Sequence, residues 1–232
     1  MNDLFELVNG EWVANHVIPA DRGIDGAFYA LRDKAEEDVH AILADGTGRG
    51  GDLFTSFMDT DRVNAAGVDA LSTDLEAVEV ANVEEFVEKL GRLERDGIGG
   101  PLTYWVEKDA QGEDAVPYLV QSGLGLPDEA YYRDEAHAQT LADYQSHIAQ
   151  MLEFLDPKYL FGLNTQIAAE RIVNVERGLA ASHWDVVKSR AAVATYNPTT
   201  LAELPPLVQK LLRSSGMPDG RVIDMMPSFT QD

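Results

Sequence analysis

The segment QSGLGLPDEAYYR, residues 121–133, separates a first part of the chain with short helical patterns from a second part with long ones. Gly123 and Gly125 can adopt positive φ without a steric penalty, which suits a sharp turn out of a strand. Pro127 and the two acidic residues after it are typical of the first turn of a helix, which the following tyrosine pair would anchor. We therefore predict a strand-to-helix turn whose role is structural.

The strand that leads into this turn belongs to a predicted hairpin. Hydrophobic residues alternate with polar ones in LTYWVEK (102–108) and in AVPYLVQ (115–121), and the polar turn DAQGED lies between the two segments. This pattern predicts an antiparallel β-hairpin over about 102–121. Pro117 has no N–H to donate, which favours an edge position for the second strand.

The rest of the chain has helical periodicity. Phe28, Leu31, Ala35, Val39 and Ile42 recur every three or four residues, which predicts a helix over about 26–43. Capping residues and apolar spacing predict further helices after Asp3, over 53–58, from Asn82 to Gly97, over 141–155, over about 165–187 and from Thr200 to Gly216. The predicted fold class is all-α (mainly α), a multi-helix domain with one small antiparallel hairpin.

Composition restricts the classes of partner. Forty Asp and Glu oppose eighteen Lys and Arg, a formal net charge of −22, so neither nucleic acid nor an anionic membrane is an expected partner. The chain has no cysteine, which excludes disulfides, thiolate zinc sites and cysteine nucleophiles. There is no signal-peptide pattern and no 18-residue apolar run, so we expect a cytoplasmic protein.

The sequence contains no catalytic motif in the context that its chemistry requires. The segment GTGRGG (46–51) matches G-x-G-x-x-G, but a predicted helix precedes it where a dinucleotide site needs a strand, so a flexible loop is the better interpretation. Two-histidine zinc spacing is absent, because no histidine has a partner three or four residues away. The histidines are His16, His40, His137, His147 and His183. The residues alone thus predict no catalytic and no metal-binding group.

Four segments in order resemble the N-terminal half of neprilysin-family zinc metalloendopeptidases of the bacterial oligopeptidase type. They are DLFELVNGEW, VIPADRGIDGAFYALRD, QSGLGLPDEAYYRD and VKSRAAVATYNPTTLAEL, and the closing VIDMMPSF resembles the strand that leads back to the catalytic part. The resemblance implies that the zinc ligands and catalytic glutamate lie beyond Asp232, so this chain has no cofactor of its own. It also implies two partners, the chain's own C-terminal catalytic domain and peptide substrates, and an inactive fragment that shapes the substrate chamber.

The resemblance further implies three segments and one binding residue. Residues 1–20 would pack with the catalytic domain, residues 21–216 would form the helical cap, and residues 217–232 would begin the return segment. Arg32 aligns with an arginine that lines the primed-side substrate subsite in mammalian members; the alternative is a surface ion pair between Arg32 and Glu36. Ile24 and Tyr29 depart from the mammalian pattern, which favours endopeptidase over dipeptidyl-carboxypeptidase activity.

Two other functions remain open from the sequence. The chain could be a stand-alone helical scaffold or peptide-binding module without catalysis, or an unrelated hydrolase that uses a pair of carboxylates. In isolation, apolar surface intended for a partner domain would favour self-association of the fragment.

Overall fold

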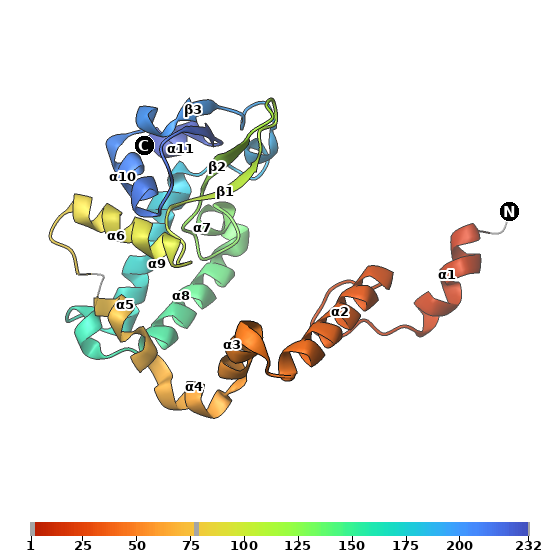
Figure 1. Cartoon of the computed structure of the whole chain (residues 1–232). Helices are drawn as coiled ribbons and strands as arrows, with labels where there is room; N and C mark the ends of the chain where they lie inside the picture. Colours follow the sequence, from red (N-terminus) through yellow and green to blue (C-terminus); the bar gives the residue numbers. More distant parts are fainter. Residues whose placement is uncertain (1–2, 77–78, 232) are drawn as a thin grey trace. The chain divides into compact units, whose positions relative to one another are not determined.

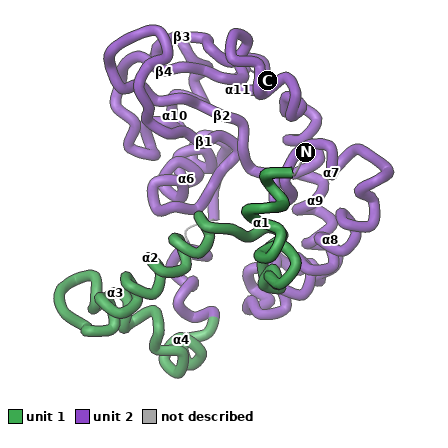
Figure 2. Tube along the Cα trace, turned by 90° about the vertical axis from the view of Figure 1, so that its right-hand side faces the viewer, with its two compact units in different colours: residues 1–67 green, residues 68–232 purple. Residues whose placement is uncertain are grey.

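The computed structural model describes residues 3–76 and 79–231 (Figure 1). The chain divides into two compact units, residues 1–67 and residues 68–232, which Figure 2 colours separately. Across the described ranges, no helix combines the length and the apolar composition that crossing a lipid bilayer requires.

Unit 1 consists of four helices, α1 (Leu4–Asn15), α2 (Ala27–Ala44), α3 (Gly48–Met58) and α4 (Thr60–Ala66). The Asp3 carboxylate caps α1 by accepting a hydrogen bond from the Phe5 backbone N–H at 3.0 Å. The helix predicted over about 26–43 is confirmed by α2. α1 contains no buried residue, although most of its side chains are apolar.

The glycine-rich segment 46–51 is more ordered than the predicted loop. α3 begins at Gly48, so most of the segment forms its first turn. Gly51 is packed so closely against the Gly46 backbone that a Cβ atom would collide with it. The preceding element is the helix α2, so the segment lacks the strand–turn–helix context of a dinucleotide site.

Unit 2 combines helices with a sheet. The 3-10 helix η1 (Gly67–Leu71) crosses the boundary between the units, and the α-helices are α5 (Ser72–Glu76), α6 (Val83–Arg95), α7 (Ala130–Arg133), α8 (Ala138–Leu152), α9 (Thr165–Ser182), α10 (Pro206–Ser214) and α11 (Pro227–Gln231). Shorter 3-10 helices are η2 (Glu135–His137), η3 (Pro157–Leu160), η4 (Lys188–Arg190) and η5 (Leu201–Glu203). α8 packs beside α9, and α6 packs beside α10 (Figure 1).

The sheet corrects the predicted fold class. Its strands are β1 (Leu102–Lys108), β2 (Ala115–Gln121), β3 (Pro198–Thr200) and β4 (Arg221–Asp224), in the order β1-β2-β4-β3. β1 and β2 form the predicted antiparallel hairpin, but β4 pairs parallel with β2 and antiparallel with β3. The protein is therefore mainly helical with a four-stranded mixed sheet, and not all-α with a single hairpin. β3 and β4 are too short to show a two-residue period in the sequence.

The edge position predicted for β2 is wrong, because β2 lies between β1 and β4. β4 pairs with β2 only at Tyr118 and Leu119. Pro117 lies one residue before this ladder, so its missing N–H costs no hydrogen bond between β2 and β4.

Two hydrophobic clusters stabilise unit 2. The first joins the sheet to α6 and α10, and its fully buried members are Leu119, Leu201, Leu212 and Val222. The second joins α7, α8 and α9 around Tyr132 and Val173. The turn segment 122–129 connects β2 to α7, and its Leu124 and Leu126 pack against the second cluster.

The two glycines of this turn have different roles. Gly123 has φ +90°, as predicted for a sharp turn. Gly125 does not have positive φ; it is required because a Cβ atom there would overlap the Tyr144 hydroxyl. Pro127 is not in the first turn of α7, since the helix begins at Ala130, whose N–H is capped by the Asp128 carboxylate at 3.0 Å.

Candidate functional site

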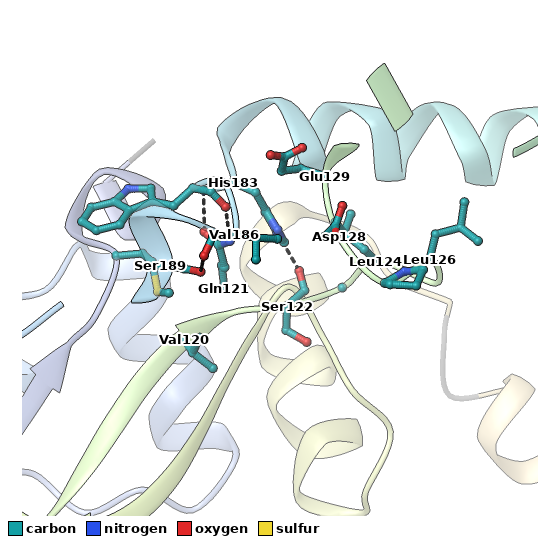
Figure 3. Close-up of a pocket in the computed structure, with 14 residues that line it drawn as sticks. Val120, Gln121, Ser122, Leu124, Leu126, Asp128, Glu129, His183, Val186 and Ser189 are labelled. Carbon is teal, nitrogen blue, oxygen red and sulfur yellow. Dashed lines mark hydrogen bonds between the residues drawn. The ribbon is translucent and has the colours of Figure 1, made fainter. Parts of the chain in front are cut away.

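A cavity of about 310 Å³ opens beside the turn segment and the residues that follow α9 (Figure 3). Its wall is formed by the end of β2, by segment 122–129, by residues between His183 and Ser189, and by Met226. We call it the hub cavity. Asp128 and Glu129 bring two carboxyl groups to the wall, and none of the lining residues is a lysine or an arginine.

The Gln121 side chain holds one wall of the hub cavity in place. Its Nε2 donates to the Trp184 backbone oxygen at 2.8 Å, and its Oε1 accepts from the Trp184 backbone N–H at 2.7 Å. Because both polar atoms of the amide are used, the pair imitates a short β-ladder between β2 and the segment after α9. The Trp184 indole N–H donates to Ser228 Oγ at 2.7 Å, which also ties this wall to α11.

His183 contributes a second link across the cavity. Its Nε2 lies 3.1 Å from the Ser122 backbone oxygen (Figure 3), and since a carbonyl can only accept, Nε2 carries the proton. Burial lowers the pKa of His183 below its ordinary value, which favours the neutral ring near pH 7. The ring also contacts Phe229 edge to face, with the ring centroids 4.9 Å apart.

Glu129 is a buried acid at the rim of two cavities. It lines the hub cavity and a neighbouring cavity of about 430 Å³ that also includes Tyr132 and Arg177. Only 7% of Glu129 is exposed, and its Oε2 has no hydrogen-bond partner among the described residues. The carboxylate forms an ion pair with Arg133, whose Nη2 lies 3.3 Å from Oε2.

A hydrogen-bond network centred on Glu176 links the turn segment to α7, α8 and α9. The Tyr132 hydroxyl donates to one carboxylate oxygen at 2.6 Å, and the Tyr144 hydroxyl donates to the other at 2.8 Å. The Tyr132 oxygen in turn accepts from the Leu126 N–H at 3.0 Å. Burial and Glu176 raise the pKa of both tyrosines, that of Tyr144 to about 12, so both hydroxyls remain donors at neutral pH.

Arg32, the residue predicted to bind substrate, lies on α2 in unit 1. Its Nε is 3.4 Å from Glu36 Oε1 and its Nη2 is 3.3 Å from Asp33 Oδ1, so the predicted ion pair with Glu36 is present. The side chain is still 51% exposed, and its guanidinium lies 5.0 Å from the Tyr29 ring centroid. The geometry is therefore compatible with both predicted roles.

The surroundings of Arg32 form a charged cluster within unit 1. Arg22 donates to both carboxylate oxygens of Asp33, at 3.0 and 3.2 Å, and holds the pKa of Asp33 below its ordinary value. Asp33 and Trp12 also line a cavity of about 650 Å³ between α1 and α2. Arg22, which precedes α2, therefore holds in place the Asp33 carboxylate that contacts Arg32.

The histidines do not form a metal centre in the described parts of the chain. Within residues 3–76 and 79–231, no group of three or more His, Asp or Glu side chains is placed to hold a metal ion. His16 instead bonds to Asp25 at 2.7 Å, and His137 stacks on Tyr131. The described residues of this chain therefore do not supply a zinc site.

Sequence reasoning found the turn segment but missed the cavity beside it. Gln121 and Trp184 are 63 positions apart, and His183 is 61 positions from Ser122, so no local pattern could have indicated their contact. The role of Glu129 was also missed, because one acid among forty carries no signal by itself.

Comparison with known proteins places this architecture in a family. The N-terminal-domain model of peptidase family M13 matches residues 1–232. The chain therefore belongs to the M13 family of zinc metalloendopeptidases and represents its N-terminal domain, which confirms the predicted resemblance.

Three relatives show how far the similarity extends. The zinc metalloprotease Zmp1 of Mycobacterium tuberculosis, in complex with an inhibitor, is 37% identical with a TM-score of 0.82, covering 99% of this chain and 38% of that one. The neutral endopeptidase of Lactococcus lactis subsp. cremoris is 32% identical over 149 residues, covering 58% of this chain and 23% of the relative. PepO from Lactobacillus rhamnosis HN001, 24% identical with a TM-score of 0.74 over 99% of this chain and 39% of that one, shares the fold. The chain thus spans less than half the length of these relatives.

Proposed function

We propose that the chain is the non-catalytic N-terminal part of a zinc metalloendopeptidase that hydrolyses peptides, where it shapes the substrate chamber. The observation that carries this proposal is the coverage: the family match spans residues 1–232, and 99% of the chain aligns with only 38% of Zmp1. Zinc would be held by residues beyond Asp232 and would supply the hydrolytic chemistry there. This chain contributes shape, surface and substrate contacts.

The exposed apolar side chains of unit 1 support a role for residues 1–20 in packing against the catalytic domain. Leu4, Leu7 and Val8 of α1 are each at least 70% exposed. A helix that is apolar on most of its faces is normally buried. On this proposal, residues 217–232 begin the return toward the same domain. In the isolated chain, the uncovered surface would favour self-association.

Hydrolysis assays on two lengths of protein test the proposed function. The protease encoded by the whole gene should hydrolyse peptides, lose activity with a chelator and regain it with zinc, whereas the 232-residue chain should be inactive. A natural stop codon after Asp232 would support the scaffold alternative. Peptide hydrolysis by the 232-residue chain in the presence of a chelator would favour the carboxylate-pair hydrolase.

Replacing Arg32 by glutamine tests its proposed contact with substrate. In the protease encoded by the whole gene, we expect kcat/KM to fall by roughly tenfold, the effect of one lost charge-assisted hydrogen bond. Lys34→Gln is the matched control, because Lys34 is also on α2 and makes an exposed ion pair with Asp38. Equal kcat/KM for both variants and the parent would assign Arg32 to the surface pair with Glu36.

A further inference from the structure

We propose that Glu94 is a pH-sensitive switch at the end of α6: uptake of a proton by its carboxylate closes the last turn of the helix onto β1, and ionisation opens that turn. The switch lies entirely in unit 2, where the carboxyl group of Glu94 approaches Thr103 of β1 (Figure 1). This inference goes beyond the proposed function and does not depend on it.

Glu94 occupies a position on α6 where the helical pattern places apolar residues. Val87 and Leu90 of the same helix pack against the first hydrophobic cluster. Residues four and seven positions apart lie on one face of a helix, so the side chain of Glu94 follows them toward the interior. Both of its carboxyl oxygens are closed to solvent, and neither has a hydrogen-bond partner among the described residues. The group is thus buried without the donors that would replace its lost water.

The charged groups around Glu94 do not compensate a negative charge there. Arg95, Asp96 and Glu107 are exposed, and the Tyr104 hydroxyl lies 3.4 Å from Ser215 Oγ. The other basic side chains of α6, β1 and α10 form ion pairs with other acids: Lys89–Glu85, Arg92–Glu88, Lys108–Glu113, Lys210–Glu84 and Arg213–Asp219.

Burial therefore raises the pKa of Glu94, and the Thr103 hydroxyl opposes this effect only in part. The position in the helix acts in the same direction as burial. Glu94 is in the last turn of α6, where the partial charge of the helix end is negative and disfavours an anion. The ionised form is thus the unfavourable one in the closed structure.

The end of α6 can open more easily than the turn before Glu94. A Cβ atom at Gly91 would collide with the Leu211 backbone oxygen, so α6 is packed tightly on α10 at that turn. After Glu94, the helix is closed by hydrogen bonds from the N–H groups of residues 96, 97 and 98 to carbonyl oxygens of α6. Gly97 has φ +90° and Ile98 is 48% exposed, so little packing supports these bonds. Opening of this end would let the ionised carboxylate reach water.

The direction of the pH effect follows from the raised pKa. Below the ordinary pKa of a glutamate, Glu94 is protonated whether the end of α6 is closed or open, so burial of its charge costs nothing. As the pH rises from the ordinary to the raised pKa, the open form releases its proton first. Above the raised pKa the full cost of the buried charge favours opening. The closed form is therefore most populated at low pH and loses population as the pH rises.

Hydrogen–deuterium exchange of the 232-residue chain, followed by mass spectrometry, tests the switch in peptides that contain residues 96–98. After correction for the intrinsic pH dependence of amide exchange, we expect several-fold faster exchange at about pH 8 than at about pH 5 in the parent chain. Glu94→Gln cannot ionise, so its exchange should stay slow at both pH values. Peptides from α8 are the internal reference and should show no such difference.

Glu170→Gln is the matched control, because Glu170 is exposed on α9 and its replacement changes the net charge of −22 by the same amount. This variant should keep the pH dependence of the parent. Thr103→Val keeps the proposal testable if Glu94→Gln does not fold. Since Thr103 lowers the pKa of Glu94, its loss should move the midpoint of the exchange transition to higher pH.

Three results would overturn the proposal. The first is the same pH dependence in Glu94→Gln as in the parent, and the second is no pH dependence in the parent. The third is loss of the pH dependence in Glu170→Gln, which would assign the effect to net charge. An unmoved midpoint in Thr103→Val would likewise show that the group that titrates is not Glu94.

Discussion

Replacing Gly125 by alanine should destabilise unit 2 by about 2–4 kcal/mol, since the new methyl group would occupy the position of the Tyr144 hydroxyl. Tyr144 would have to leave its hydrogen bond to Glu176, and the turn segment would lose its contact with α8. The measurement is urea unfolding of the 232-residue chain, followed by circular dichroism. A loss of this size is a large part of the stability of a typical domain.

Gly178→Ala is the matched control for this substitution. Gly178 lies inside α9, and nothing lies within 4 Å of the position that its Cβ would occupy. Alanine in a helix interior is more favourable than glycine by roughly 0.5–1 kcal/mol, so this variant should be slightly more stable than the parent. Equal stability of both variants would show that the turn segment can change its conformation at little energetic cost and that Gly125 is not required for packing.

Replacing Glu176 by alanine should cost about 3 kcal/mol, because the carboxylate accepts from two tyrosine hydroxyls that would lose their partner. The same unfolding experiment measures the loss, and Glu170→Ala on the exposed side of α9 is the control with the same change in charge. A second measurement identifies the cause. Burial and Glu176 raise the pKa of Tyr144 to about 12, so ionisation of tyrosine should begin at lower pH in the variant. An unchanged tyrosine titration would mean that the loss of stability does not come from these two hydrogen bonds.

Local patterns predicted the elements whose evidence is contained in a few neighbouring residues. The spacing from Phe28 to Ile42 identified α2, and alternation on both sides of a polar turn identified the hairpin of β1 and β2. The first position of α7 was predicted too early, because Asp128 caps the helix from outside and Pro127 was assumed to lie within it. Side chains near a helix start can serve as caps or as helical residues, and sequence alone does not separate the two.

Features that depend on distant partners could not be predicted in this way. β3 and β4 contain three and four residues, and they become strands only because each finds a neighbour elsewhere in the chain. Gly125 was recognised as special, but for its backbone freedom and not for its contact with Tyr144. The hub cavity depends on His183 and Trp184, which nothing in the turn segment indicates. The family was recognised because four matching segments occur in the same order along the chain.

The parallel pairing of β2 with β4 has a consequence for synthesis on the ribosome. The hairpin of β1 and β2 can form early, but the strand that covers the second side of β2 comes from residues 221–224. Until those residues emerge, the nascent chain carries an open strand edge next to Leu119, which is completely buried in the finished fold. Open edges of this kind pair readily with other chains. Chaperone capture of the growing polypeptide, or slow translation past Asp224, would therefore affect how much of it matures correctly.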